Sequence, residues 1–82
     1  MSFAYNFIPE LTRDSLYRYV NHHVPTGSFL RAVLTNNLFE AVGRADDENL
    51  KALKFIVTYI YNEVPSNCWG SEEKVQEWLK KE

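Results

Sequence analysis

The sequence predicts an all-α protein, a compact bundle of four to five short helices with an extended aromatic N-terminal arm. Apolar residues recur at helical spacing along most of the chain, and capping residues and prolines separate these periodic segments. The 82 residues are 45% hydrophobic and 15% aromatic, which is typical of a globular chain. This length fits a single helical domain, residues 1–82, near the lower limit for a self-sufficient core, so we expect a homo-oligomer.

The N-terminal arm is expected over residues 1–9. In the stretch FAYNFI, Phe3, Tyr5 and Phe7 alternate with other residues and share one side if the segment is extended. We expect this arm to pack across its own domain. Its exchange between two subunits is the alternative.

The first helix is expected to start at Thr12, which follows Pro9 and can serve as the N-cap. Leu11 can then pack on Leu16 as a hydrophobic staple. The helix ends within HHVPTG, residues 22–27, because the residue before a proline resists helical geometry. Its buried stripe is expected to comprise Leu16, Val20 and one of Tyr17 or Tyr19.

The second helical segment is expected to begin at Ser28 and to end at Gly43, which acts as a C-cap. TNN at residues 35–37 lies in its middle and has weak helix propensity. The sequence therefore predicts a kink, or two short helices that meet there. The apolar stripe is expected to comprise Phe29, Ala32 or Val33, Leu38, Ala41 and Val42.

The third helix is expected to start at Asp46 or Asp47 and to run to about Asn62. The composition of FIVTYIY alone would favour a strand. The period favours a helix, because five apolar residues recur at alternating steps of three and four residues. These residues, Leu50, Leu53, Val57, Ile60 and Val64, are expected to form the buried seam.

A fourth helix is expected after Pro65 and the loop SNCWG. Ser71 can cap it, and the two glutamates that follow suit the positive end of the helix dipole. Its docking residues are expected to be Val75, Trp78 and Leu79.

Charge and composition exclude several classes of protein. The net charge of −2 argues against bulk nucleic-acid binding. The single cysteine, Cys68, excludes an internal disulfide, and with only His22 and His23 beside it a zinc site is not expected. No apolar stretch approaches the ~20 residues that span a bilayer, and the first residues lack the basic region of a signal peptide. We expect a cytoplasmic protein without a membrane segment, a metal or a cofactor.

No catalytic residues stand out. His22 and His23 suit the C-terminal end of a helix, and Cys68 next to a tryptophan is typical of a small buried hydrophobic residue. The acidic run at 46–48 is typical of a helix start and lacks the alternating spacing of a calcium loop. The sequence therefore favours a non-enzymatic protein.

Six residues are candidates for ligand binding: Ser28, Arg31, Asn36, Asn37, Arg44 and Trp69. After Gly27, Ser28 is either a plain helix cap or, with Arg31 over the free amides, part of an anion cradle. The plain cap is favoured, because no phosphate-binding glycine pattern is present. Trp69 either covers an edge of the core or stacks on a planar ligand, and core cover is the commoner role.

Asn36 and Asn37 cost helix propensity in the middle of a helical segment. If they are buried, their amides must find hydrogen-bond partners. Arg44, Asp46 and Asn49 could join them in a polar knot that fixes the corner between the second and third helices. Alternatively, the same amides and guanidinium groups could bind a base edge or a phosphate.

Several segments together resemble a family of small proteins from tailed bacteriophages and prophages. The shared patterns are P-x-G-x-F-L-x-A-V-L-x-N at 25–36, A-D-x-x-N at 45–49, Y-N-E-x-P at 61–65 and C-W-G-S at 68–71. The resemblance covers the chain from about Ile8 onward and brings no established activity with it. It implies a phage setting in a bacterial host cell, where accessory proteins of this size tend to be binders and inhibitors, for instance in counter-defence.

Two functions follow as hypotheses. The first is sequestration of a phosphorylated nucleotide-type signal. Arg31 and Arg44 would bind phosphate, Asn36 and Asn37 the base or ribose edges, and Trp69 or a tyrosine would supply a stacking face. The alternative is a protein–protein interaction module that inhibits a host factor. A cleft on which Arg31, Arg44 and Asn36 converge would favour the first hypothesis. Saturation of the same residues by backbone contacts would favour the second.

Overall fold

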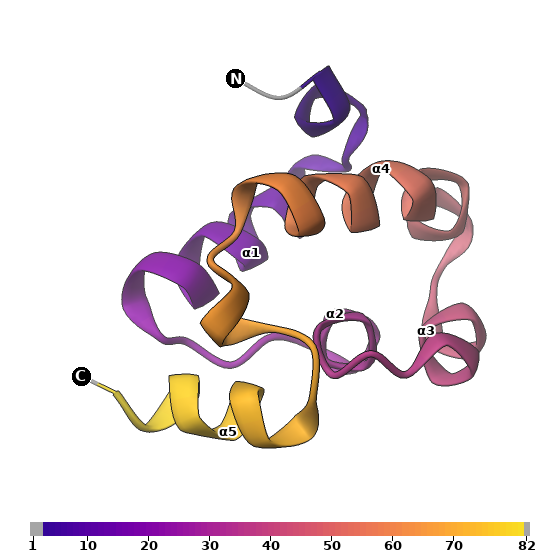
Figure 1. The fold of residues 1–82 in the computed structure, drawn as a ribbon. Helices are drawn as coiled ribbons and strands as arrows, with labels where there is room; N and C mark the ends of the chain where they lie inside the picture. The colour runs from indigo at the N-terminus through magenta and orange to yellow at the C-terminus, as the bar shows by residue number, and fades with distance from the viewer. Residues whose placement is uncertain (1–2, 82) are drawn as a thin grey trace.

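The structure, a computed structural model, describes residues 3–81 and contains helices and no strand within that range. The all-α bundle that the sequence predicts is confirmed. In Figure 1, α4 crosses the molecule with η1 beside it, while α2, α3 and α5 lie along the opposite side. The elements, in chain order, are η1 (Phe3–Phe7), α1 (Glu10–His22), α2 (Ser28–Leu34), α3 (Leu38–Arg44), α4 (Asp47–Glu63), η2 (Ser66–Cys68) and α5 (Glu72–Lys80).

The core lies between these helices and takes residues from all five α-helices and from η2. Its least exposed large side chains belong to α1, α2, α4, η2 and α5. They are Leu16, Tyr19, Leu34, Ile56, Cys68 and Val75. Tyr19 is 1% exposed and Tyr17 is 59% exposed. Of the two tyrosines that could complete the buried stripe of α1, Tyr19 does so.

The prediction of an extended N-terminal arm is wrong for residues 3–7, which form the 3-10 helix η1. The ring of Tyr5 lies 5.0 Å from that of Tyr59, and the ring of Phe7 lies 4.8 Å from that of Phe55. Both partners are on α4, about one helical turn apart. The 3-10 helix thus places Tyr5 and Phe7 against two successive turns of α4. The segment packs on its own chain, as expected. Residues 1–2 of the expected arm lie outside the described residues.

The start of α1 differs from the prediction. The helix begins at Glu10 after Pro9, and Thr12 is a buried residue of its first turn. The Thr12 hydroxyl donates a hydrogen bond of 2.6 Å to Oδ1 of Asn49, so Thr12 joins α1 to α4. Leu11 is 81% exposed and forms no staple with Leu16.

The break at residues 35–37 is confirmed, because α2 ends at Leu34 and α3 begins at Leu38. Gly43 is not the C-cap. It lies inside α3, which runs on to Arg44 with Ala45 as its C-cap.

The ends of α4 and the cap of α5 agree with the sequence. The Asp46 side chain accepts a 2.8 Å hydrogen bond from the backbone N–H of Asn49, and Ser71 accepts one of 3.2 Å from that of Lys74. The predicted seam of α4 is only partly buried, since Leu50 is 45% and Val57 is 47% exposed. Ile60 and Val64 of the predicted seam are buried, and Ala52 and Ile56 complete the buried stripe of α4.

Candidate functional site

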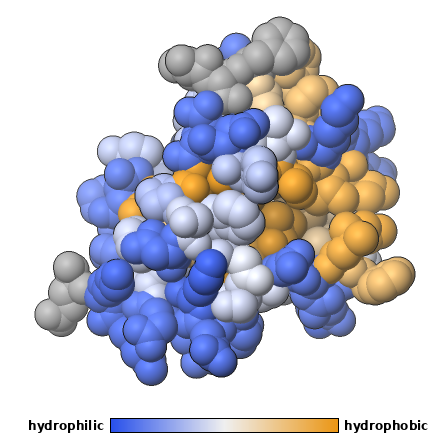
Figure 2. All heavy atoms as spheres, viewed as in Figure 1, coloured by the Kyte–Doolittle hydropathy of each residue, from blue (hydrophilic) through white to orange (hydrophobic). Residues whose placement is uncertain are grey.

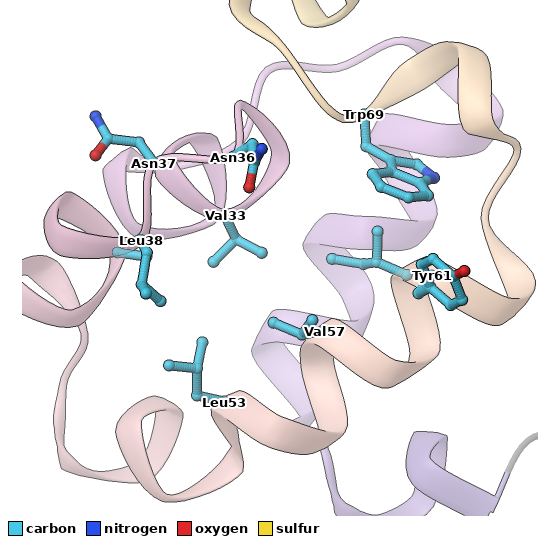
Figure 3. A pocket seen from close by; sticks show the side chains of 10 residues that line it. Val33, Asn36, Asn37, Leu38, Leu53, Val57, Tyr61 and Trp69 are labelled. Atoms are coloured by element: carbon cyan, nitrogen blue, oxygen red, sulfur yellow. The ribbon is translucent and has the colours of Figure 1, made fainter.

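Hydrophobic side chains of α3, α4 and the end of α2 border a groove with a volume of about 220 Å³. Val33, Leu53 and Val57 point into it from its two sides (Figure 3). Tyr61 and Trp69 close one end, with their ring centroids 6.0 Å apart. The lining is mainly apolar, and the volume is below the about 300–1,000 Å³ of typical small-molecule pockets. The groove therefore suits an inserted hydrophobic side chain better than a nucleotide.

Exposed hydrophobic side chains continue from the groove over the outer surface of α3 and α4. Phe39 on α3 is 90% exposed, and Tyr61 on α4 is 72% exposed. Figure 2 shows apolar residues gathered on the side of the molecule where α3 and this flank of α4 lie. We call the groove and this surface the α3–α4 face. Its exposed hydrophobic residues are Leu38, Phe39, Val42, Leu50, Val57 and Tyr61.

Three of the six predicted site residues, Asn36, Asn37 and Trp69, line the groove. Ser28 and Arg31 lie at the start and middle of α2, and Arg44 lies at the end of α3, all outside the groove. The structure thus divides the predicted set and does not bring the two arginines together with the asparagines.

Ser28 is not the N-cap of α2. Gly27 holds that position, and the Ser28 side chain is exposed in the first turn. The Arg31 guanidinium is turned toward α5, where it forms an ion pair with Glu72. The hydrogen bond from Arg31 lowers the pKa of the Glu72 carboxyl group, so the glutamate stays charged. An anion at Arg31 would have to displace this carboxylate.

Arg44 pairs with Glu40, one turn earlier on α3, and the hydrogen bond to Glu40 raises the pKa of the arginine. Asp46 caps α4 and Asn49 accepts from Thr12. The expected polar knot with Asn36 and Asn37 therefore does not form among the described residues. Arg44, Asp46 and Asn49 each have other hydrogen-bond partners.

Asn36 and Asn37 form the turn between α2 and α3 through their backbone. Asn36 has φ 64°, the left-handed conformation that asparagine tolerates better than most residues. Its N–H donates to Val33 O (3.1 Å) and that of Asn37 to Ala32 O (2.8 Å), which is the Schellman pattern at a helix end. The Asn37 side chain then caps α3 by accepting from the N–H of Glu40 at 3.4 Å. The weak helix formers at 36–37 are therefore explained by the turn.

Trp69 serves the core and the groove together. It is half-buried against the core, and its indole N–H donates a 3.1 Å hydrogen bond to the carbonyl of Val64. The next residue, Gly70, has φ 116° and donates its N–H to Leu34 O at 2.7 Å. Side chains other than hydrogen are strained at that φ, so glycine is needed here to hold Trp69 against the end of α2.

A second cluster of polar contacts joins α1, η2 and α5 on the other side of the core. The Tyr19 hydroxyl donates to Cys68 O (2.7 Å), and the Trp78 indole N–H donates to Tyr19 O (2.8 Å). Cys68 is fully buried, as expected, and burial raises the pKa of its thiol. His23 ends α1 in the left-handed conformation, with Nδ1 2.9 Å from Trp78 O. These groups hold α1, η2 and α5 together.

The exposed residues of the α3–α4 face are what the sequence analysis missed as a site. Leu38, Val42, Leu50 and Val57 were all expected in the core. One signal could have identified the surface: α4 carries apolar residues over most of its circumference, which is more than one small domain buries.

No family model, curated protein or solved structure matches this chain. Among the described residues, no three His, Cys, Asp or Glu side chains gather where they could hold a metal ion. None of the helices in residues 3–81 has the length and apolar character needed to cross a membrane.

Proposed function

We propose that this protein is a non-enzymatic phage accessory protein that binds another polypeptide through the α3–α4 face and so inhibits a factor of the bacterial host. The observation that carries the proposal is the face itself, a groove of about 220 Å³ flanked by large exposed hydrophobic residues. Exposed apolar surfaces of this kind mark interaction sites. A groove between helices is the receptor in helix-in-groove recognition of amphipathic segments.

The phage setting, counter-defence and the bacterial cytoplasm belong to this proposal. They are supported by the family resemblance of residues 25–71 and by the composition of the chain.

Sequestration of a nucleotide-type signal has less support. Its phosphate-binding residues, Arg31 and Arg44, are each paired with a glutamate and lie outside the groove. Asn36 has its backbone N–H engaged in the turn. The three residues therefore do not converge on one cleft, as the ligand hypothesis requires, and this supports the protein-interaction alternative.

The experiment is affinity purification of the full chain from phage-susceptible bacterial cells, with three variants compared by quantitative mass spectrometry. Val57→Lys places a charge in the groove and should lose the specific partner, because a buried unpaired charge is costly at an interface. Leu11→Asp changes an equally hydrophobic but distant exposed residue and should keep it. The double variant Arg31→Ala with Arg44→Ala should also keep it.

Native mass spectrometry of the wild-type protein with cyclic and linear nucleotides supplies the opposing test. We expect no retained nucleotide. A retained nucleotide that is lost in Arg31→Ala would replace the proposed function with the ligand-binding one.

A further inference from the structure

The α3–α4 face carries both an exposed aromatic ring, that of Phe39, and a groove. Phe39 is 90% exposed at the start of α3, and the residue before it, Leu38, lines the groove. A two-fold symmetric contact brings the same patch of both chains together, so a protrusion on one meets a depression on the other. We propose that, in the free protein, a second copy covers the α3–α4 face, with Phe39 of each chain in the groove of the other.

This inference rests on the proposed function for the face and names what covers it when no host protein is bound. The host partner would then bind by displacing the second copy.

The exposed area is comparable with that of a small dimer interface. Phe, Tyr and Trp side chains bury about 150–250 Å² each, and the lower end of that range is an upper value for leucine and valine. The exposed fractions of the six residues, from 44% for Val42 to 90% for Phe39, then amount to on the order of 600 Å² per chain. Standard interfaces bury about 800 Å² per partner. The largest apolar patch of an ordinary monomer is about 300–600 Å². The face is therefore at the upper limit for an ordinary monomer and at the lower limit of the standard interface size.

The helices and charges are compatible with self-association. Leu50, Leu53 and Val57 follow the spacing of three and four residues by which one helix packs along another. On α3, Glu40 and Arg44 neutralise each other within one chain. The net charge of each copy is only −2, so electrostatic repulsion between two copies is weak.

The test is sedimentation equilibrium of the purified full chain, with no partner present, from about 1 μM to about 300 μM. We expect the mass to rise from the 9.6 kDa of one chain to twice that value. Phe39→Asp should weaken the dimer at least about a hundredfold, because a central aromatic anchor dominates such an interface and is lost twice.

Leu11→Asp is the matched control. Leu11 and Phe39 are each the second residue of a helix, and they are 81% and 90% exposed. An aspartate is favourable at the N-terminus of both helices, so both variants should fold. Leu11→Asp should dimerise like the wild type.

A mixing experiment tests the reciprocal geometry. Phe39→Asp leaves the groove intact, and Val57→Lys leaves Phe39 intact, so each alone should be monomeric. Their mixture restores one of the two Phe39–groove contacts and places the introduced aspartate of one variant near the introduced lysine of the other at the second contact. We expect a heterodimer at concentrations where neither variant self-associates.

A wild-type chain that stays monomeric over the whole range would overturn the inference and leave the proposed function standing. So would a dimer unaffected by Phe39→Asp. A wild-type dimer together with a partner retained by Val57→Lys would uphold the dimer and overturn the proposed function.

Discussion

Tyr19 is the residue through which three parts of the chain are joined. Its hydroxyl bonds to η2, its carbonyl accepts from α5, and its side chain is 1% exposed. Burial raises the pKa of the phenol well above its usual value, and the nearby Cys68 thiol adds to the effect. The phenol therefore keeps its proton in the folded state at pH values where it loses it in the unfolded chain.

This shift predicts a loss of stability in alkali. Above about pH 10, the unfolded state binds fewer protons than the folded state, so the free energy of unfolding falls as the pH rises. Urea denaturation followed by circular dichroism at a series of pH values measures the slope. Tyr19→Phe should be less stable at neutral pH by about 1 kcal/mol, since it loses a hydrogen bond, and should show a shallower alkaline decline. Tyr17→Phe, an exposed change on the same helix, should keep the slope of the wild type.

Asn36 is a second residue with a specific role, because its backbone conformation restricts which amino acids the position tolerates. At φ 64°, most side chains cost about 1–2 kcal/mol and glycine costs none. Asn36→Ala should therefore lower the free energy of unfolding by about 1 kcal/mol, while Asn36→Gly should keep or raise it. The same urea denaturation assay checks both. Equal effects of the two substitutions would mean that the turn does not select the residue.

At the scale of the elements, two glycines have opposite roles. Gly43 lies inside α3, and a Cβ there would meet nothing within 4 Å. Gly43→Ala should raise stability by about 0.5–1 kcal/mol, because alanine is the better helix former. Gly70 has φ 116°, so Gly70→Ala should lower stability by about 1–3 kcal/mol. Thermal denaturation of both variants measures the difference. A loss of stability in Gly43→Ala would instead indicate that Gly43 is the C-cap, as the sequence predicts.

The ends of most helices could be predicted because they depend on neighbouring residues. Asp46 and Ser71 cap the helices they precede, and the weak formers at 35–37 separate α2 from α3. Thr12 is an exception. It could cap a helix locally, but its hydroxyl donates a hydrogen bond to Asn49, 37 positions away. Local signals predict that a helix ends near a residue, and a distant partner decides which residue ends it.

The face that each helix buries depends on distant partners and was predicted less well. The seam of α4 has correct helical spacing, yet the core takes Ile56 while Val57 remains half exposed. The candidate site has the same limit. Arg31 pairs with Glu72, which is 41 residues away in the sequence, so its guanidinium is engaged within the chain. No local sequence pattern predicts this pair. Asn36, Asn37 and Trp69 do meet at one groove, although as turn residues and core cover.

As a whole molecule, the chain forms a slab of 31 × 28 × 19 Å. Its thin dimension is close to two helix diameters of about 10 Å each. Two layers of helices leave α4 with three apolar surroundings: the core at Ile56, η1 at Phe55 and Tyr59, and the open groove at Val57. The first two are covered by the chain itself, and the third is available for association.

This arrangement predicts that substitutions at two adjacent residues of α4 have different effects on stability. Ile56→Ala should lower the free energy of unfolding by about 2–5 kcal/mol, because it opens a cavity in the core. Val57→Ala should change the stability of the monomer by less than about 1 kcal/mol. Denaturation of both variants in the Phe39→Asp background, where association is removed, gives the values without a contribution from the dimer. Similar losses at the two positions would place Val57 in the core.

The two tryptophans occupy different surroundings, and this has a practical consequence. Trp69 lines the groove, whereas Trp78 contacts His23, with ring centroids 4.5 Å apart, at the junction of α1 and α5. Indole emission depends on how much water reaches the ring. A Trp78→Phe chain would thus carry a single tryptophan, at the groove, and the emission of that tryptophan would report occupancy without an attached dye.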